Sequence, residues 1–429
     1  MRRTMIARMI PAALLTIGAG GASASGFQLL EQNASGLGNA YAGSAAVAEN
    51  ASTIFFNPAG MTQLQAREVS FGVAAVRPSF DFKNRGSQAG ALTGDGKDAG
   101  GWSAIPNAYL SWALNKDLYL GVGLGAPFGL ITDYDESWVG AAQSIKFEIK
   151  TYNINPSIAY RVNDKWSIGA GVSWQRMEAE YERAVGIFGP PLPFSSSMAK
   201  LDVDGDAWGW NIGALFTPSP NMKVGVSYRS KVDHELDGKV KVSGPSAALN
   251  AGGTSKAQVD VELPDTFVVS VAQKLDDRWE MLGDLSWTGW SSVDFVDIDR
   301  TSGPAAGTTA QTLKVEFKDT WRLALGANYR LNDAWKLKFG VARDQSPVKD
   351  RQRRLVALPD QDRTWFTFGG QWKTTKTTTL DLGAAYLYVR DTKIDNNQSS
   401  LNPLQNRGRV TGKYDSNVWL LGAQYSMAF

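Results

Sequence analysis

The chain has 429 residues, with 44 basic and 42 acidic side chains and no cysteine. Because nucleic-acid binding normally requires a concentrated basic surplus, this near balance argues against a nucleic-acid partner. No segment approaches 18 consecutive apolar residues, which excludes a protein that crosses a membrane with helices. A β-barrel stays open, since its strands alternate lipid-facing and lumen-facing residues and average to mild polarity.

The N-terminus is typical of a secretory signal peptide. Its elements are early arginines, a short apolar core and an A-x-A cleavage site, at Arg2, Arg3, Arg8, residues 10–17 and residues 22–24. The core is far shorter than the roughly 20 residues that a membrane helix needs. We therefore predict that residues 1–24 are removed on export and that the mature chain begins at Ser25.

Residues 25–66 are rich in small side chains, do not alternate in polarity and hold too few large apolar residues to form their own core. We predict that this segment is a plug inside a larger container. Within it, Pro58 fixes φ and the Asn57 side chain can hydrogen-bond to nearby backbone. The tripeptide Asn57-Pro58-Ala59 therefore predicts a rigid turn.

From residue 67 to residue 429, short polar turns separate segments in which apolar and polar residues alternate, the period of a β-strand. We predict an all-β protein, a 14-stranded antiparallel transmembrane β-barrel with the N-terminal hatch, or plug, in its lumen. The even number agrees with bacterial single-chain barrels. The predicted strands are 68–82, 105–113, 118–131, 144–162, 166–184, 201–216, 222–242, 258–274, 279–298, 312–331, 335–344, 364–372, 377–389 and 409–429.

Aromatic content and alternation indicate which face of the predicted barrel meets lipid. The chain carries 15 Trp, 13 Tyr and 18 Phe, as expected of aromatic girdles at two lipid interfaces. Between Trp321 and Tyr329 the odd residues are apolar and the even ones small or polar, so we expect the odd face to meet lipid. The terminal Phe429, in phase with Tyr425, is the usual signal for the barrel-insertion machinery. We therefore expect this machinery as a partner, and we expect the protein to be a monomer.

The third predicted strand contains a dense run of glycines with one proline. A proline removes a hydrogen-bond donor from the ladder, and each glycine weakens the strand. We predict a gap in the barrel wall there, a lateral opening, at Gly125, Ala126, Pro127, Phe128 and Gly129. The alternative is a plain β-bulge at the barrel rim.

Two predicted outer loops have unusual compositions. Residues 186–194 are apolar, and an exposed apolar loop favours an apolar ligand. The candidate capture residues are Ile187, Phe188, Leu192 and Phe194. The basic run Arg351 to Arg354 is most simply a surface cluster that faces anionic lipopolysaccharide.

Three ordered motifs in the plug carry a family resemblance: Gly26-Phe27-Gln28-Leu29, the stretch from Ser35 to Gly43, and Asn57-Pro58-Ala59-Gly60. Together they resemble the N-terminal hatch of the FadL family, outer-membrane transporters of long-chain fatty acids and other hydrophobic compounds. The resemblance implies a 14-stranded barrel, a hatch in its lumen and a lateral opening where the third strand kinks. It also implies that Phe27 and Lys318 contact the ligand.

We therefore expect passive uptake of long-chain fatty acids through the bacterial outer membrane. An apolar acid would be captured at the apolar loop and pass to a pocket near Phe27. Its carboxylate would meet a basic residue, Lys318 or Arg322. These two residues are an even number of positions apart and so are expected on the same, inward face of the strand. Asn57-Pro58-Ala59 would be the gate, with Asn57 bridging to backbone near the kink. The plainer alternatives are ordinary lumen charge ladders for the two cations and a turn without a gating role for the tripeptide.

The sequence argues against an enzyme. An outer-membrane hydrolase generally needs a histidine base, and the chain has only His234, flanked by Asp233 and Glu235 and interpreted as solvated surface. We expect no enzyme activity, no metal and no cofactor. The remaining alternatives are an aromatic hydrocarbon channel of the same family and a non-selective porin.

Overall fold

A computed structural model describes residues 26–188, 197–245, 247–403 and 405–429. The predicted signal peptide and two capture candidates, Leu192 and Phe194, lie outside these ranges. No helix in the described ranges is long and apolar enough to cross a membrane.

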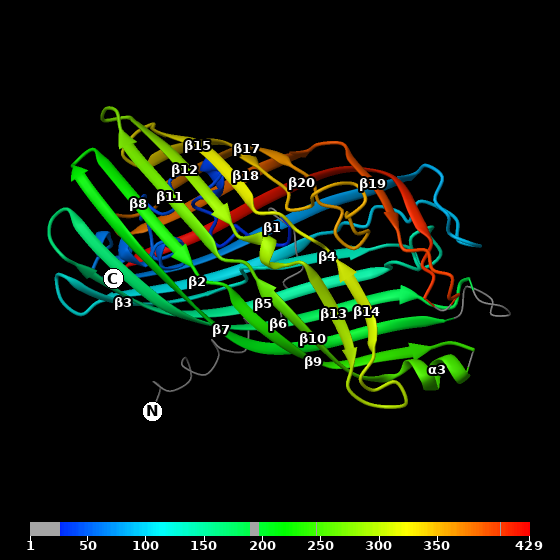
Figure 1. The fold of residues 1–429 in the computed structure, drawn as a ribbon. Helices are drawn as coiled ribbons and strands as arrows, with labels where there is room; N and C mark the ends of the chain where they lie inside the picture. The colour runs from blue at the N-terminus through cyan, green and yellow to red at the C-terminus, as the bar shows by residue number, and fades with distance from the viewer. Residues whose placement is uncertain (1–25, 189–196, 246, 404) are drawn as a thin grey trace, which may run out of the picture.

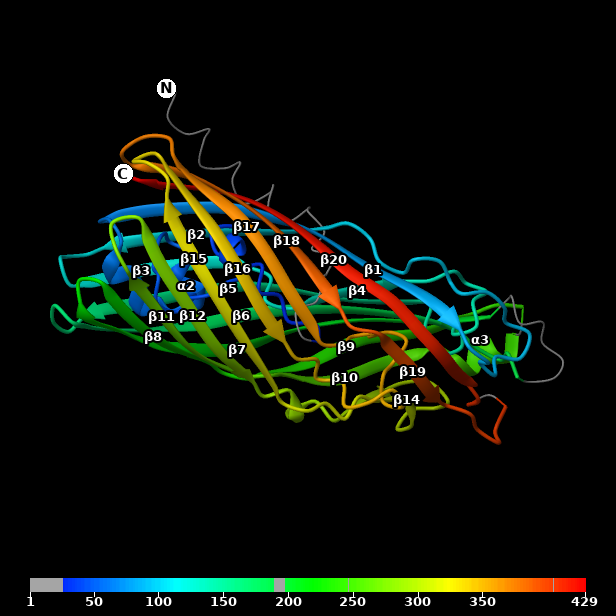
Figure 2. The same cartoon turned by 90° about the horizontal axis from the view of Figure 1, so that it is seen from above.

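The described residues form one closed antiparallel sheet of 20 strand segments (Figures 1 and 2). Eight barrel strands are continuous: β1 (Arg67–Asn84), β2 (Ser103–Ala113), β5 (Lys146–Arg161), β6 (Trp166–Ala184), β7 (Met198–Ser219), β16 (Trp335–Asp344), β17 (Arg363–Lys373) and β20 (Arg409–Ala428). Six are interrupted: β3 (Leu118–Gly125) with β4 (Gly129–Asp133), β8 (Met222–Arg229) with β9 (Val232–Ser243), β10 (Ser255–Leu263) with β11 (Thr266–Lys274), β12 (Trp279–Thr288) with β13 (Phe295–Arg300), β14 (Thr309–Lys314) with β15 (Thr320–Arg330), and β18 (Thr378–Val389) with β19 (Thr392–Asn397).

The segments make a barrel of fourteen strands, one for each predicted strand. The sheet closes where β1 pairs with β20, from Glu68 opposite Ala428 to Asn84 opposite Gly412. Because the sheet closes, no sheet edge is left free at this seam. A lipid environment requires this, since it offers no water to satisfy unpaired backbone groups. Within the described ranges, the helical elements outside the hatch are α3 (Ala247–Gly253) and η5 (Trp290–Ser292).

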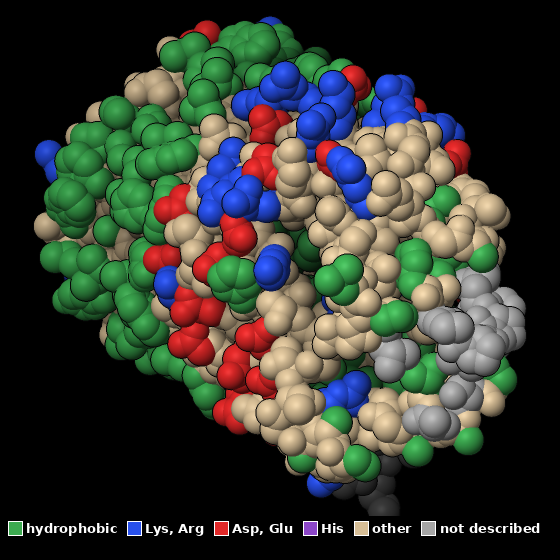
Figure 3. Space-filling view, turned by 45° about the vertical axis from the view of Figure 1, so that its right-hand side comes forward, with side chains coloured by type: hydrophobic (Ala, Val, Ile, Leu, Met, Phe, Trp, Pro, Cys, Tyr) green, Lys and Arg blue, Asp and Glu red, His purple; other side chains and the backbone are tan. Residues whose placement is uncertain are grey.

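The predicted faces are confirmed on β15. Trp321, Leu323 and Leu325 are 50–54 % exposed on the outside, whereas Arg322 and Ala324 are buried toward the lumen. Beyond this apolar belt, the outward faces of β6, β7 and β9 carry charged side chains, and Figure 3 shows charges gathered between the belt and the loop end. The loop end of the barrel therefore projects past the apolar belt.

The hatch lies inside the barrel, at the end with the short turns (Figures 1 and 2). It contains η2 (Leu37–Asn39), α2 (Thr53–Phe56) and η3 (Pro58–Gln63), and the Asn57 side chain caps η3 by accepting from Ala59 N–H. As its composition predicts, polar contacts hold it together: Asn33 to Ser52 at 2.7 Å, Asn50 to Ser35 at 2.9 Å and the Tyr41 hydroxyl to the Asn33 carbonyl at 2.9 Å.

Wall glycines let the hatch backbone touch the barrel. A Cβ on Gly225 would overlap the Ala45 carbonyl oxygen, and one on Gly340 would overlap the Asn39 carbonyl. Both positions therefore exclude any side chain, because the hatch backbone occupies that space. The small residues of the hatch and of the inner wall are complementary halves of one contact.

The position of the apolar belt yields a testable expectation. Leu325→Lys places a charge at the middle of the lipid-facing side of β15, which costs about 2–4 kcal/mol at a bilayer midplane. Leu331→Lys is the matched control, since Leu331 is equally exposed but lies next to a turn, where the cost falls to about 0–1 kcal/mol. Urea unfolding in lipid vesicles measures both, and equal costs would contradict the assigned belt.

Candidate functional site

The third barrel strand is interrupted where its glycines and proline predict. β3 ends at Gly125 and β4 begins at Gly129, and both pair with β5. On the other side, β2 pairs with β3 only through residues 108–113. Among the described residues no pairing joins β2 to β4. The interruption is thus more than a bulge, because the ladder between two neighbouring wall strands stops.

The first hatch residues occupy this interruption. Residues 26–32, here called the tail, run antiparallel to the kink, with Gln28 bridged to Phe128. The hydrogen bonds are Leu29 N–H to Pro127 O at 2.8 Å, Gly129 N–H to Phe27 O at 2.8 Å and Gln32 Nε2 to Ala126 O at 2.7 Å. The tail thus supplies backbone partners that the interrupted ladder lacks.

The expected contact between Asn57 and the kink is wrong. Asn57 is fully buried in the remainder of the hatch, residues 33–66, which we call the hatch body. Its Nδ2 donates to Ala45 O at 2.7 Å and to Ala214 O on β7 at 3.0 Å. Both amide hydrogens are used on that side of the lumen, so the kink is contacted by the tail instead. A gating role for Asn57, Pro58 and Ala59 stays a prediction.

Phe27 lies at one end of an apolar pocket in the lumen. Its ring contacts Trp290 at 4.9 Å and Phe128 of the kink at 5.9 Å between centroids, and Trp290 contacts Phe317 at 5.6 Å. The aromatic residues that line the pocket are Phe27, Phe147, Tyr181 and Phe317, and the remaining lining residues are Met177 and aliphatic ones such as Leu236, Val259 and Leu355. Every lining side chain but that of Tyr181 is wholly apolar, so the pocket suits a hydrocarbon.

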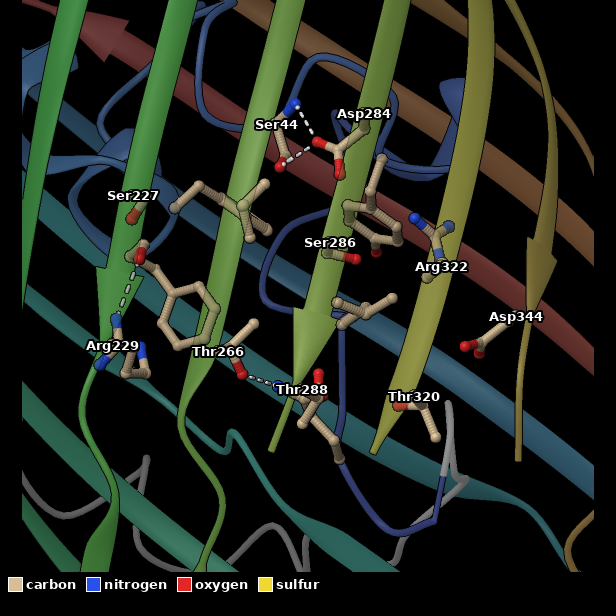
Figure 4. A pocket seen from close by; sticks show the side chains of 16 residues that line it. Ser44, Ser227, Arg229, Thr266, Asp284, Ser286, Thr288, Thr320, Arg322 and Asp344 are labelled. Atoms are coloured by element: carbon tan, nitrogen blue, oxygen red, sulfur yellow. Dashed lines mark hydrogen bonds between the residues drawn. The ribbon is translucent and has the colours of Figure 1, made fainter. Parts of the chain in front are cut away.

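A second, polar cavity lies on the other side of the tail (Figure 4). Gln28 lines it and is held between Thr266 at 3.1 Å and Thr288 at 3.4 Å. Arg322 lines it as well, with Nη2 donating to Ala40 O at 2.6 Å and the guanidinium 5.1 Å from the Trp365 ring centroid. Because Phe27 lines the apolar pocket and Gln28 the polar cavity, the tail separates the two spaces.

Lys318 does not share the inward face of Arg322. It is exposed, and residues 315–319 leave the strand between β14 and β15. Glu316 has a positive φ of 43°, which breaks the two-residue alternation that would place Lys318 on the same face as Arg322. Phe317, the residue before Lys318, points into the apolar pocket instead. Ligand contact by Lys318 stays a prediction.

An outer cavity adjoins the apolar pocket toward the loop end, and the two share Tyr181, Leu201 and Ile298. Its polar lining includes three arginines that sequence reasoning missed, Arg183, Arg300 and Arg407. In the described part of the chain none of them forms an ion pair. Their hydrogen bonds go to neutral groups: Gln311 at 2.8 Å, Gly253 O at 2.6 Å with Ser255 at 3.1 Å, and Gln398 at 3.4 Å.

These three charges are uncompensated. Burial, together with the Arg407 charge, lowers the pKa of Arg183 to about 9, so the group stays charged at pH 7. Burial lowers the pKa of Arg300 and Arg407 as well. One indication in the sequence places Arg183 toward the lumen. On β6 it is an even number of residues from Met177 and Tyr181, which face inward. The outer cavity is therefore suited to an anion next to an apolar chain.

Two loop predictions need correction. Ile187 and Phe188 are half-buried rather than exposed, and they pack against a loop-end core beside Gly90 and Gly408. The run Arg351 to Arg354 is not a free basic surface. Arg354 is buried against the carbonyls of Asp360 and Lys393, and Arg353 pairs with Glu316 and Asp350.

A family model described as outer membrane protein transport protein (OMPP1/FadL/TodX) matches residues 15–429. The chain belongs to the FadL family. As a member of that family it is a non-enzymatic transporter of hydrophobic compounds in the bacterial outer membrane.

Relatives of this FadL-family chain cover its whole length. It is 28 % identical to a long-chain fatty acid transport protein of Salmonella typhi, with 100 % of both chains aligned. A Pseudomonas aeruginosa FadL homologue superposes with a TM-score of 0.85 at 22 % identity, covering 94 % of this chain and 99 % of the other. The Pseudomonas putida toluene transporter TodX gives 0.70 at 17 % identity, with 94 % and 100 % covered.

His234 is buried, not solvated as its neighbours suggested. It lies on β9, where outward-facing Asp233 and Glu235 place this part of the strand beyond the apolar belt. The His234 side chain is 2 % exposed and contacts the Gln175 side chain at 3.0 Å. No cluster of metal-ligating side chains occurs within the described ranges of this FadL-family protein.

Burial of the single histidine predicts a pH effect. Desolvation lowers the pKa of His234 to about 4, against an ordinary value near 6.5. The unfolded chain therefore binds the proton first, and stability is lost as pH falls from about 6.5 to about 4. The one imidazole signal in an NMR titration should have its midpoint near 4. A midpoint near 6.5, or a stability profile unchanged by His234→Gln over this range, would contradict the assignment.

Proposed function

We propose that this FadL-family protein takes up long-chain fatty acids passively. The acid is captured at the loop end, held with its chain in the apolar pocket, and released sideways through the kink when the tail moves. One observation carries the proposal: the same tail residue, Phe27, closes the apolar pocket with its ring and bonds the kink with its carbonyl. A single displacement of the tail would therefore open both the pocket and the wall.

The physical difficulty lies in release rather than capture. Burying roughly fifteen methylenes at about 0.8 kcal/mol each gives an upper limit near 12 kcal/mol. Withdrawal of Phe27 removes part of the pocket wall and weakens that binding without an energy source, since the ligand only shifts an existing equilibrium. Because β2 and β4 do not pair with each other among the described residues, the acyl chain would have an exit into the lipid between them once the tail has moved.

The outer cavity favours an acid over a neutral hydrocarbon. Three arginines without an acidic partner would bind a carboxylate by charge-assisted hydrogen bonds. Aromatic hydrocarbons are the second candidate, because the rings of Phe27, Trp290 and Phe317 would accept a flat apolar molecule. A non-selective porin fits poorly, since the hatch occupies the lumen at the end with the short turns (Figures 1 and 2).

The initial capture step stays a prediction for the apolar loop 186–194, including Ile187 and Phe188. Lys318 and Arg322 stay candidate contacts of the carboxylate. Lys318 would reach it from the exposed segment beside Phe317, and Arg322 would reach it after the tail has moved. Lipopolysaccharide and outer-membrane lipid are the expected surroundings of the exit.

A disulfide lock tests whether the tail moves. The chain has no cysteine, and Gln28 and Phe128 form a bridged pair of the non-hydrogen-bonded kind, whose Cα atoms typically lie about 4.5 Å apart. Gln28→Cys with Phe128→Cys should transport fatty acid when reduced and lose uptake when oxidised, because the tail can no longer leave the kink.

The matched lock holds the hatch body instead. Ala42→Cys with Gly326→Cys joins it to β15, where the two Cβ positions lie 3.0 Å apart and need a small shift for a disulfide. Uptake should then persist in the oxidised state. Transport that survives the tail lock, or that stops only with the hatch-body lock, would refute exit past the tail.

The arginines predict a selectivity test. Arg183→Met or Arg407→Met should lower oleate uptake by about tenfold, the value of one hydrogen bond to a charged group, while toluene uptake stays unchanged. Arg176→Met is the control, because Arg176 is on the same strand but faces outward in ion pairs with Asp204 and Asp206. Equal losses for oleate and toluene would assign these arginines to structure and remove the preference for acids.

A further inference from the structure

A buried ionic contact ties the hatch body to the barrel wall at a distance from the tail. Lys338 on β16 has a side chain only 2 % exposed. Its ammonium donates to Glu49 Oε2 at 2.6 Å, to the Ser35 carbonyl at 2.8 Å and to Asp381 Oδ1 on β18 at 3.1 Å. All three donors are used, two on the hatch and one on the wall.

The contact extends into a balanced network. Glu49 also accepts from Lys336 at 2.7 Å, and Asp381 also accepts from Gln371 at 3.0 Å. Two cations and two carboxylates therefore neutralise one another. Removing one member of a buried network leaves an uncompensated charge, which is far more costly than replacing the whole set by apolar groups.

This network borders a polar space inside the hatch. A cavity there is lined by Ser35, Glu49 and Asn50, and it shares Tyr41, Ser44 and Phe56 with the polar cavity beside the tail. The adjoining cavities carry polar side chains that suit water and ions, beside apolar ones such as Phe56. A shift of the hatch body away from β16 would open a gap between the hatch and the wall next to this cavity.

We propose that Lys338 is a positioning residue that fastens the hatch body to the wall and keeps the barrel closed to small ions. The seal is then separate from the gate: Lys338, Glu49 and Asp381 hold the hatch body still, while the tail is left to move. This inference concerns ion exclusion and stands whether or not the transported compound is a fatty acid.

The test is electrical and needs no substrate. Lys338→Met protein, checked for a folded barrel by heat-modifiable mobility, is inserted into planar bilayers in KCl. Loss of the buried pair should raise the population of a displaced hatch on the order of a hundredfold or more, seen as new single-channel openings. Lys338→Arg, which retains the charge and donors, should restore a closed barrel.

Lys223→Met is the matched control. Among the described residues, the Lys223 ammonium forms one 3.5 Å hydrogen bond to Val47 O of the hatch and no ion pair with the network, so this variant should stay closed. If Lys338→Met does not assemble, Glu49→Gln is measured instead, because it changes the hatch and leaves the wall sequence intact. A folded Lys338→Met or Glu49→Gln barrel that stays as silent as the wild type would overturn the proposal, as would equal leakage from Lys223→Met.

Discussion

The hydrogen bonds between the tail and the kink are the contact on which the rest of the structure depends. A wall in lipid must satisfy its backbone groups, and a cylinder of this width must be filled by something other than wall side chains. At Ala126, Pro127 and Gly129 the wall fails the first requirement, and the tail meets it with Gln32, Leu29 and the Phe27 carbonyl. The same tail places the Phe27 ring against Trp290, so the integrity of the wall and the shape of the pocket share one element.

Polar contacts are concentrated at the hatch body. The pocket above Phe27 is aliphatic and aromatic, whereas the hatch body contacts the wall through amides, hydroxyls and the buried Lys338 network in addition to small apolar residues. Apolar packing is non-directional and tolerates ligands of different length, while buried polar contacts fix one register. The molecule thus combines an adaptable binding space with a precisely placed closure.

The sequence predicts what is local. Two-residue alternation and turn chemistry yield fourteen strands and the correct lipid face of β15, and the glycines with Pro127 mark the interruption. Five other interruptions were missed, and one of them, at residues 315–319, moved Lys318 off the inward face. Asn57, Arg354 and His234 each have a partner distant in sequence, Ala214, Lys393 and Gln175 respectively, so no local pattern could reveal that these polar groups are buried. Arg183, Arg300 and Arg407 meet only through the closed barrel.

Closure of the sheet also has a consequence for biogenesis. The hatch precedes every barrel strand in the sequence, yet β1 and β20 join along seventeen residue pairs, from Glu68 to Asn84, only once the last strand exists. We therefore expect the hatch to enter the lumen before or while the ring closes. Lys338 and Asp381 would lose their water in that step, which would couple the folding of the hatch to the zipping of the seam.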